Sequence, residues 1–539
     1  LKRSRIFAIA MGIAAIFFLL VLVWAFMQYL EADTQRKKAD IALADADVQR
    51  NLALANADEA KKNADEAEKS AAEALEAQKE AELKRIEAEK ARENATKSAK
   101  EAKRQSVIAK NKAEEARRAL IQAEENRKEA EEQRAEANKN ANTAREAKKD
   151  ADKLRMLSIS KSMAIKSQQL RRNLQEKGLI AYEAYIFNET YGGEPHQSDV
   201  YGGLYEAAKA LQPKKFKQFE MHTAAVRSMQ PIAENAFLSA GSDGKIIRWD
   251  DDAPKIIATE KGRIRKIAVG PERTSFVSAN ESGAITVYTE SGDSIVKKLV
   301  GHDGAAIDVA FLGANQIVSL GVDSLVYVWN INTGEKFTLD SKSEQIRTIS
   351  VSHDSKTIVG GCNSGKVLIW DAEKQQEVTS YDLGISNPIT NIAFNEHDDR
   401  IALGDMSGVI RVLDANANLS VLYTEVGHTA RITDLVFSKD DKYMASSGLD
   451  GTVRLFLTQD YDLAPIVLND HLDWVWTVAF SDDGKTIYSG SMNNIIQKFP
   501  TDTDQLADLM CPVLKRNMTK AEWEKYVAPD IPYEKTCEK

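Results

Sequence analysis

The sequence has few cysteines and no concentrated excess of basic residues. Three cysteines occur in 539 residues, and 72 Lys and Arg stand against 81 Asp and Glu, which gives a net charge of -9. Binding the phosphates of a nucleic acid needs clustered positive charge. The composition therefore argues against a nucleic-acid partner. Gly and Pro are absent from 31 to 177, and large apolar residues are sparse there, so this stretch cannot form a globular core.

Charged residues are absent from 6 to 30, and most residues of this stretch are apolar. At about 1.5 Å per helical residue, this segment is long enough to cross a hydrocarbon layer of roughly 30 Å. We predict a transmembrane helix over 6–30 rather than a cleavable signal peptide, whose apolar region would be shorter. Lys2, Arg3 and Arg5 precede it and favour a cytoplasmic stub at 1–5. The prediction is a single-pass protein of a bacterial inner membrane, with its C-terminal part in the periplasm.

An alanine recurs at every seventh position of 31–153, without a break from Ala32 to Ala151. A seven-residue period of this length predicts a left-handed coiled coil, which would act as a stalk and make the protein a homo-oligomer. The alternative is a single helix stabilised by ion pairs four residues apart, such as Glu80 with Lys84. Residues 154–212 are richer in large apolar groups and predict a short helical adaptor.

A repeat of about 40 residues follows over 213–500. Two copies contain a His, a Ser, an Asp and a Trp at matching spacings: His222, Ser239, Asp243 and Trp249, then His302, Ser319, Asp323 and Trp329. The pattern resembles the WD-repeat family. The resemblance implies an all-β propeller with a buried network of these side chains in each blade.

The same offsets predict seven blades along the chain. Blades 2, 4 and 5 lack the His. The other two blades keep part of the set: His428, Ser446 and Asp450 in blade 6, and His471 and Ser489 in blade 7. The Trp slots of these two blades hold Phe456 and Phe499, and Asn493 stands in the Asp slot of blade 7. We expect 214–220 to pair with the end of blade 7 and close the ring.

The starts of the first strands of the blades supply a candidate partner surface, which consists of Arg227, Arg263, Arg265, Arg347, Arg431, Trp474 and Trp476. Arginine with exposed tryptophan is typical of interaction hot spots. We therefore expect an acidic protein or peptide partner on this face. An equally open alternative is that the arginines pair with neighbouring turn aspartates and the tryptophans wedge between blades.

The sequence contains no clear set of catalytic residues. Four of the seven histidines occupy blade slots, and the others show neither a neighbouring nucleophile nor metal-ligand spacing. We predict no catalytic residue, no cofactor and no metal site. A propeller enzyme is the least favoured alternative.

The chain ends on a tail at 501–539, in which Cys511 and Cys537 bracket the stretches RNMT, EW and PYEKTC. With the stalk and propeller, this ending resembles the C-terminal half of bacterial STAND-type signalling ATPases. The chain lacks a G-x-x-x-x-G-K-[ST] loop, so we expect any nucleotide-binding domain upstream of Leu1. The favoured function is a non-catalytic sensor or interaction module, and a constitutive envelope scaffold is the alternative.

The location bears on the two cysteines of the tail. Outside the cytoplasm a disulfide between Cys511 and Cys537 can persist. Two reduced cysteines that merely pack are the alternative, which a cytoplasmic location would favour.

Overall fold

A computed structural model describes residues 95–250, 253–374 and 378–537. The chain divides into two compact units between Ser158 and Ile159. The first unit is helical in its described part, and the second contains the propeller, the helices next to it and the tail.

Helix α2 (Ala95–Gln169) occupies the described part of the first unit and continues into the second. It extends past the predicted start of the adaptor at 154, because no Gly or Pro interrupts the sequence there. One face of the helix carries the seven-residue alanine series, whose members are 2–8% exposed: Ala116, Ala123, Ala130, Ala137, Ala144 and Ala151. These alanines are buried, but the described residues do not show the predicted coiled coil or homo-oligomer. The predicted stalk at 31–94 lies outside the described residues.

The predicted localisation is corrected. In the described part of the chain, no helix is long and apolar enough to cross a membrane. Helix α2 is rich in charged residues, and α3 has only 17 residues, fewer than the roughly 20 that a hydrocarbon layer requires. The prediction of a single-pass protein with a periplasmic C-terminal part is therefore not retained. The segment 6–30, from which it came, lies outside the described residues.

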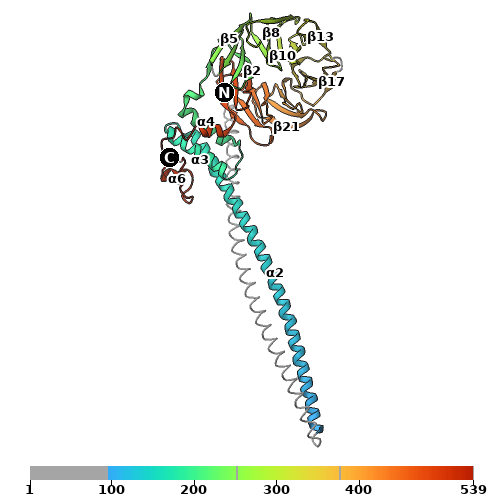
Figure 1. Ribbon diagram of the computed structural model, residues 1–539, viewed down its shortest axis with the longest axis vertical. Helices are drawn as coiled ribbons and strands as arrows, with labels where there is room; N and C mark the ends of the chain where they lie inside the picture. Colours follow the sequence, from blue (N-terminus) through green and yellow to red (C-terminus); the bar gives the residue numbers. More distant parts are fainter. Residues whose placement is uncertain (1–94, 251–252, 375–377, 538–539) are drawn as a thin grey trace, which may run out of the picture. The chain divides into compact units, whose positions relative to one another are not determined.

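The second unit contains seven four-stranded antiparallel sheets, which form the blades of a ring (Figure 1). Apolar side chains of neighbouring sheets pack together between the blades, as those of blades 3 and 4 do. The seven-bladed all-β propeller with helices N-terminal to it confirms that part of the predicted fold.

Within each blade, the strands are given in order from the innermost to the outermost. The strands of blades 1 to 3 are β2 (Val226–Ala233), β3 (Ala236–Gly241), β4 (Lys245–Asp250), β5 (Ala253–Thr259), β6 (Ile264–Val269), β7 (Ser275–Asn280), β8 (Ala284–Thr289), β9 (Ile295–Val300), β10 (Ala306–Leu312), β11 (Gln316–Gly321), β12 (Val326–Asn330) and β13 (Lys336–Leu339). Those of blades 4 to 6 are β14 (Ile346–Val351), β15 (Thr357–Cys362), β16 (Val367–Asp371), β17 (Val378–Tyr381), β18 (Ile389–Phe394), β19 (Arg400–Asp405), β20 (Val409–Asp414), β21 (Ser420–Val426), β22 (Ile432–Phe437), β23 (Tyr443–Gly448), β24 (Val453–Leu457) and β25 (Ile466–Leu468). Blade 7 consists of β26 (Val475–Phe480), β27 (Thr486–Ser491), β28 (Ile495–Pro500) and β1 (Phe219–Glu220).

The ring closes where the two ends of the propeller pair. Strand β1 precedes blade 1 in the sequence but pairs with β28, and Phe219 lies opposite Ile496. This confirms the expected closure. It also gives the last blade an outer strand, so that β28 is not left as an unpaired edge.

A polar residue stands at the third position of every innermost strand: Ser228, Lys266, Asp308, Thr348, Asn391, Asp434 and Thr477. Several accept a hydrogen bond from the backbone of the next blade, namely Ser228 from the Ile267 N–H (3.1 Å), Asp308 from Ile349 (2.9 Å), Asp434 from Val478 (3.2 Å) and Thr477 from Met229 (3.2 Å). The Lys266 ammonium lies 3.3 Å from Asp434. These contacts join blades by side chain as well as by packing.

Four short helices and one 3-10 turn accompany the propeller: α3 (Leu174–Thr190), α4 (Ser198–Leu211), η1 (Pro213–Phe216), α5 (Thr503–Asp508) and α6 (Lys520–Tyr526). Helix α4 packs on α3, on α5 and on β25. Its Tyr201 hydroxyl donates to the Pro500 carbonyl (2.7 Å), and Lys209 donates to Asp470 (2.6 Å). The helices are therefore part of the same compact unit as blades 6 and 7.

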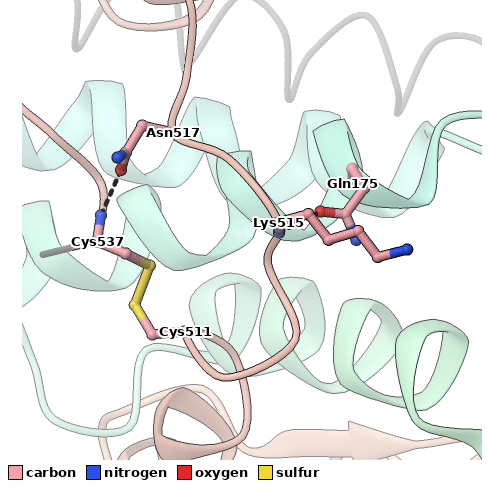
Figure 2. The surroundings of a disulfide bond; sticks show 5 residues. All are labelled: Gln175, Cys511, Lys515, Asn517 and Cys537. Carbon is pink, nitrogen blue, oxygen red and sulfur yellow. Dashed lines mark hydrogen bonds between the residues drawn. A yellow bond between two sulfur atoms is a disulfide. The ribbon is translucent and has the colours of Figure 1, made fainter. Parts of the chain in front are cut away.

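The tail is held to helix α3 near a disulfide. Cys511 and Cys537 are bonded, with their Cα atoms 5.9 Å apart (Figure 2). The Cys537 N–H donates to the Asn517 side chain (2.7 Å), and the Lys515 N–H donates to Gln175 of α3 (2.8 Å). The loop that the disulfide closes thus rests on the helical region.

Candidate partner-binding face

One end of the propeller is built by a hydrogen bond that repeats in all seven blades. The turn between the second and third strands donates a backbone N–H to the residue just before the innermost strand: Ser242 to Ala225, Glu281 to Arg263, Val322 to Ala305, Asn363 to Gln345, Met406 to Pro388, Leu449 to Arg431 and Met492 to Trp474, at 2.8–3.0 Å. The two connections therefore share one end of the ring. We call the predicted Arg and Trp positions there the arginine face: Arg227, Arg263, Arg265, Arg347, Arg431, Trp474 and Trp476.

Arg227 of blade 1 contacts Trp476 of blade 7, which in turn contacts Trp474. The Arg227 guanidinium carbon lies 3.8 Å from the centre of the Trp476 ring, a cation–π arrangement. The Trp474 and Trp476 rings are 6.1 Å apart and edge-on. Trp476 is half-buried, whereas Trp474 is 46% exposed. One tryptophan therefore bridges two blades, and the other faces solvent.

The remaining arginines have few acidic partners. Arg263 and Arg265 share Glu281, at 3.7 and 3.3 Å, and Arg347 donates to Asn363 at 3.1 Å. Within the described residues, neither Arg227 nor Arg431 has a carboxylate inside 4.0 Å. The alternative prediction, that the arginines pair with acidic residues of the turns, therefore holds for Arg263 and Arg265. Their partner is a glutamate, Glu281, rather than the expected aspartate.

Like charges crowd one another on this face. Burial, followed by the charges of Arg265, Arg431 and Arg263, lowers the pKa of Arg227 to about 10. Burial and then the charge of Arg347 lower the pKa of Arg431. An arginine remains protonated under these conditions. Burial is the main cause of both shifts and the neighbouring arginines add to it, so the protein holds these cations at a cost in stability.

The predicted blade residues meet in a linear network in blade 1. The Trp249 indole N–H donates to the Ser239 hydroxyl (2.8 Å), which lies 2.8 Å from His222 Nε2. His222 Nδ1 lies 3.0 Å from Asp243, which also accepts the Thr223 N–H at 2.8 Å. Burial alone would raise the pKa of Asp243, but the hydrogen bonds from His222 and the backbone hold that pKa at about 2.

Blade 3 contains the same contacts at nearly the same distances. They link Trp329 to Ser319 (2.8 Å), Ser319 to His302 (2.8 Å) and His302 to Asp323 (3.1 Å). The structure therefore brings together all eight residues of the two complete blades.

Blades 6 and 7 contain shorter versions of the network. In blade 6, His428 lies 2.8 Å from Ser446 and 2.9 Å from Asp450. In blade 7, His471 Nε2 lies 2.6 Å from Ser489, but its Nδ1 has no partner among the described residues. Burial lowers the pKa of His471 to about 4.

A glycine two positions before the aspartate accompanies the His–Asp pair of the repeat in blades 1, 3 and 6. A Cβ at Gly241 would lie 2.6 Å from His222 Nδ1 and 2.7 Å from Asp243, so the pair leaves no room for a side chain. Blades 3 and 6 have Gly321 and Gly448 there, whereas blade 7 has Ser491. The sequence contains this signal, because the glycine has the same offset in blades 1, 3 and 6, but the predicted blade network did not include it.

Blade 2 contains a different network that the sequence inspection also missed. Glu260 replaces the His, and it accepts hydrogen bonds from Asn280 (2.5 Å), Tyr288 (2.9 Å) and Ser278. Ser278 and Tyr288 have the same separation in sequence as Ser239 and Trp249. Tyr288 therefore stands in the Trp slot, and a carboxylate performs the role of the imidazole.

The opposite end of the ring carries the two histidines of the turns between first and second strands. His353 of blade 4 lies 3.0 Å from Asp398 of blade 5, and His397 lies 2.5 Å from Asp441 of blade 6. These exposed pairs link successive blades. In the described part of the chain, no three His, Cys, Asp or Glu side chains are grouped to hold a metal ion.

Part of the repeat region matches a known protein family. The family model described as WD domain, G-beta repeat matches residues 213–250, 335–371, 419–456 and 465–498. The chain carries WD40 repeats. Propellers of this kind generally bind protein partners and generally lack catalytic activity.

Three curated relatives are similar to parts of this WD40 chain. Autophagy-related protein 16 of Arabidopsis thaliana is 23% identical over 168 residues, which is 30% of this chain and 33% of that protein. Pre-mRNA-processing factor 19 of Bos taurus is 24% identical over 205 residues, 35% of this chain and 40% of that protein. Nuclear distribution protein nudF of Aspergillus niger is 27% identical over 172 residues, 30% and 39% of the two chains.

The chain therefore spans less than half the length of each of these relatives. All three come from eukaryotes. The matches support the WD40 propeller and give no support to the predicted bacterial origin or to the resemblance to bacterial STAND-type ATPases.

Proposed function

We propose that this chain is a non-catalytic interaction module whose propeller recognises an acidic protein or peptide partner through the arginine face. The crowding of arginines carries this proposal. Five guanidinium groups gather at one end of the ring, and Glu281 is the carboxylate that pairs with two of them. Uncompensated like charges lower the stability of a fold, and such departures are expected where a protein binds something.

The exposed tryptophan adds to the case for a protein partner. Trp474 is 46% exposed beside the arginines, although a tryptophan is usually well buried. Arginine and tryptophan are the residues most enriched among those that dominate binding energy. A folded scaffold gains nothing from leaving this ring in water.

The proposal also gives helix α2 a role as a stalk. The alanine period is typical of a stalk, and a stalk can relay partner binding to another domain or simply hold the partner at a distance. Hydrogen exchange of residues 95–158 with and without a captured partner separates the two. A change on binding supports the sensor, and no change supports the scaffold.

Charge reversal tests the function. Full-length wild type and the variant Arg227→Glu with Arg431→Glu are immobilised and exposed to a lysate of the source organism, and the captured proteins are quantified by mass spectrometry. We expect a set of acidic proteins to be captured by the wild type and lost from the variant. The matched control is Arg172→Glu, an exposed arginine between α2 and α3. The control should capture what the wild type does. If the variant Arg227→Glu with Arg431→Glu also does so, the proposal is wrong.

A further inference from the structure

The blade 7 edge of the arginine face carries an apolar ledge made of Leu472, Trp474 and Met492. Leu472 is 95% exposed, Trp474 46% and Met492 44%. Single exposed apolar residues are common on soluble proteins, but these three are adjacent. Met492 donates its N–H to the Trp474 carbonyl at 2.8 Å, and Leu472 lies two residues before Trp474.

Arg227, Arg265 and Arg431 are the candidates for an anion site, and Arg227 contacts Trp476 beside this ledge. All three belong to the crowded cluster that lowers the pKa of Arg227. Three N–H donors of the face have no acceptor among the described residues: Arg265 Nε, Arg431 Nε and Trp476 Nε1. Buried donors without acceptors are rare in folded proteins. An anion bound here supplies the acceptors and the negative charge that this site lacks.

Trp476 connects the two sites. Its ring lies 3.8 Å from the Arg227 guanidinium and 6.1 Å from the Trp474 ring. On an extended peptide, side chains two residues apart point to the same side and are separated by roughly 6–7 Å. Because Trp476 contacts both Arg227 and Trp474, one extended segment can present one side chain to Arg227 and another to Trp474.

We propose that the arginine face binds a linear segment of its partner in which an anionic side chain enters the anion site and a large apolar side chain, two residues away, covers the ledge. This inference rests on the proposed function and specifies the chemistry of the ligand. The anionic group is a carboxylate or a phosphoryl group, since arginine binds either in a bidentate manner. The apolar side chain contributes by removing Leu472 and Trp474 from water.

Five fluorescein-labelled synthetic peptides in a Gly-Ser frame test the inference by anisotropy with the full chain. Their central residues are Asp-Ser-Phe, phosphoserine-Ser-Phe, Asp-Ser-Ser, Ser-Ser-Phe and Ser-Ser-Ser. We expect at least one of the two anionic Phe peptides to bind about tenfold tighter than either single-feature peptide, as for the loss of one hot-spot contact. Its identity tells which anion the site prefers.

Variants assign each feature to its site. Arg227→Glu should remove the advantage of the anionic residue and reduce the salt dependence, whereas Leu472→Ala with Trp474→Ala should remove the advantage of Phe alone. A sixth peptide, with Lys-Ser-Phe at its centre, should bind Arg227→Glu better than it binds the wild type, a gain that misfolding cannot produce. Val426→Ala is the matched control, since Val426 is 76% exposed on β21 of blade 5.

Two outcomes overturn the inference. In one, the combined peptides bind no better than the single-feature peptides. In the other, the two sets of variants do not separate the anionic and apolar contributions. If this happens while charge reversal still removes captured proteins, the proposed function stands and only the linear segment is wrong. If charge reversal also has no effect on capture, both fail.

Discussion

Blades 6 and 7 are neighbours in the ring, and each has a buried histidine next to a serine, yet only one histidine has a carboxylate. His428 lies 2.9 Å from Asp450, whereas His471 has Asn493 in the corresponding slot. The residue two positions earlier differs as well, since Gly448 in blade 6 becomes Ser491 in blade 7. Two residues, the aspartate and the glycine two positions before it, thus distinguish the blade that has the His–Asp pair from the blade that lacks it.

Acid should weaken blade 7 through His471, and this is the largest expected effect. The pKa of His471 is about 4 in the folded chain, below the 6.5 of an unfolded histidine. The unfolded state therefore binds a proton between these values and the folded state does not, so stability falls as the pH drops from 6.5 to 4. The loss approaches about 3 kcal/mol at pH 4.

Urea unfolding at pH 7 and pH 4 checks this prediction. His471→Gln should lose less stability over this interval than the wild type does. An equal loss in both proteins would assign the acid sensitivity to other groups.

Filling the glycine position of blade 6 should break its pair. In Gly448→Ala, the new Cβ would lie 2.7 Å from His428 Nδ1 and 2.9 Å from Asp450. Overpacking of this kind costs about 1–3 kcal/mol, which thermal unfolding can measure. The matched control is Gly270→Ala, whose nearest neighbour would be 3.2 Å away. The two variants should differ clearly, and similar melting temperatures would contradict the role of the glycine.

The reverse change should complete blade 7. Ser491→Gly with Asn493→Asp makes room for a carboxylate beside His471 Nδ1, and a charge-assisted hydrogen bond there should stabilise the fold by about 1 kcal/mol. The single variant Asn493→Asp, which keeps the Ser491 side chain, should gain less. Chemical denaturation of the three proteins at pH 7 provides the measurement.

The exposed His397–Asp441 pair should show the smallest effect, with the opposite pH dependence. The hydrogen bond to Asp441 raises the pKa of His397, so its contribution is full below the unfolded pKa and is lost as the pH rises through the folded value. His397→Gln should therefore lower the melting temperature slightly at pH 5.5 and less at pH 8.5. A larger effect at the higher pH would rule out this assignment.

Spacing in the sequence identified the blades, because strands of fixed length repeat the same offsets. It could not identify contacts between blades, such as Asp308 accepting the Ile349 N–H, because these depend on how neighbouring sheets meet. Glu260 escaped notice because a carboxylate and an imidazole look unrelated in sequence, although both accept a hydrogen bond from serine. For the candidate site, the repeat offsets in the sequence placed the arginines at one end of the ring. They could not predict that Glu281 pairs with both Arg263 and Arg265, or that Arg227 stacks on Trp476.

The blade comparison also separates the scaffold from the candidate site. Gly321→Ala disturbs the network of blade 3, which contributes no arginine to the face, whereas Arg227→Glu with Arg431→Glu changes the face and keeps every glycine. The decisive measurement is quantitative capture by the full-length wild type and both variants, well below their unfolding temperatures. We expect Gly321→Ala to retain the captured proteins and the charge variant to lose the acidic ones. Equal capture by the wild type and the charge variant would contradict this expectation.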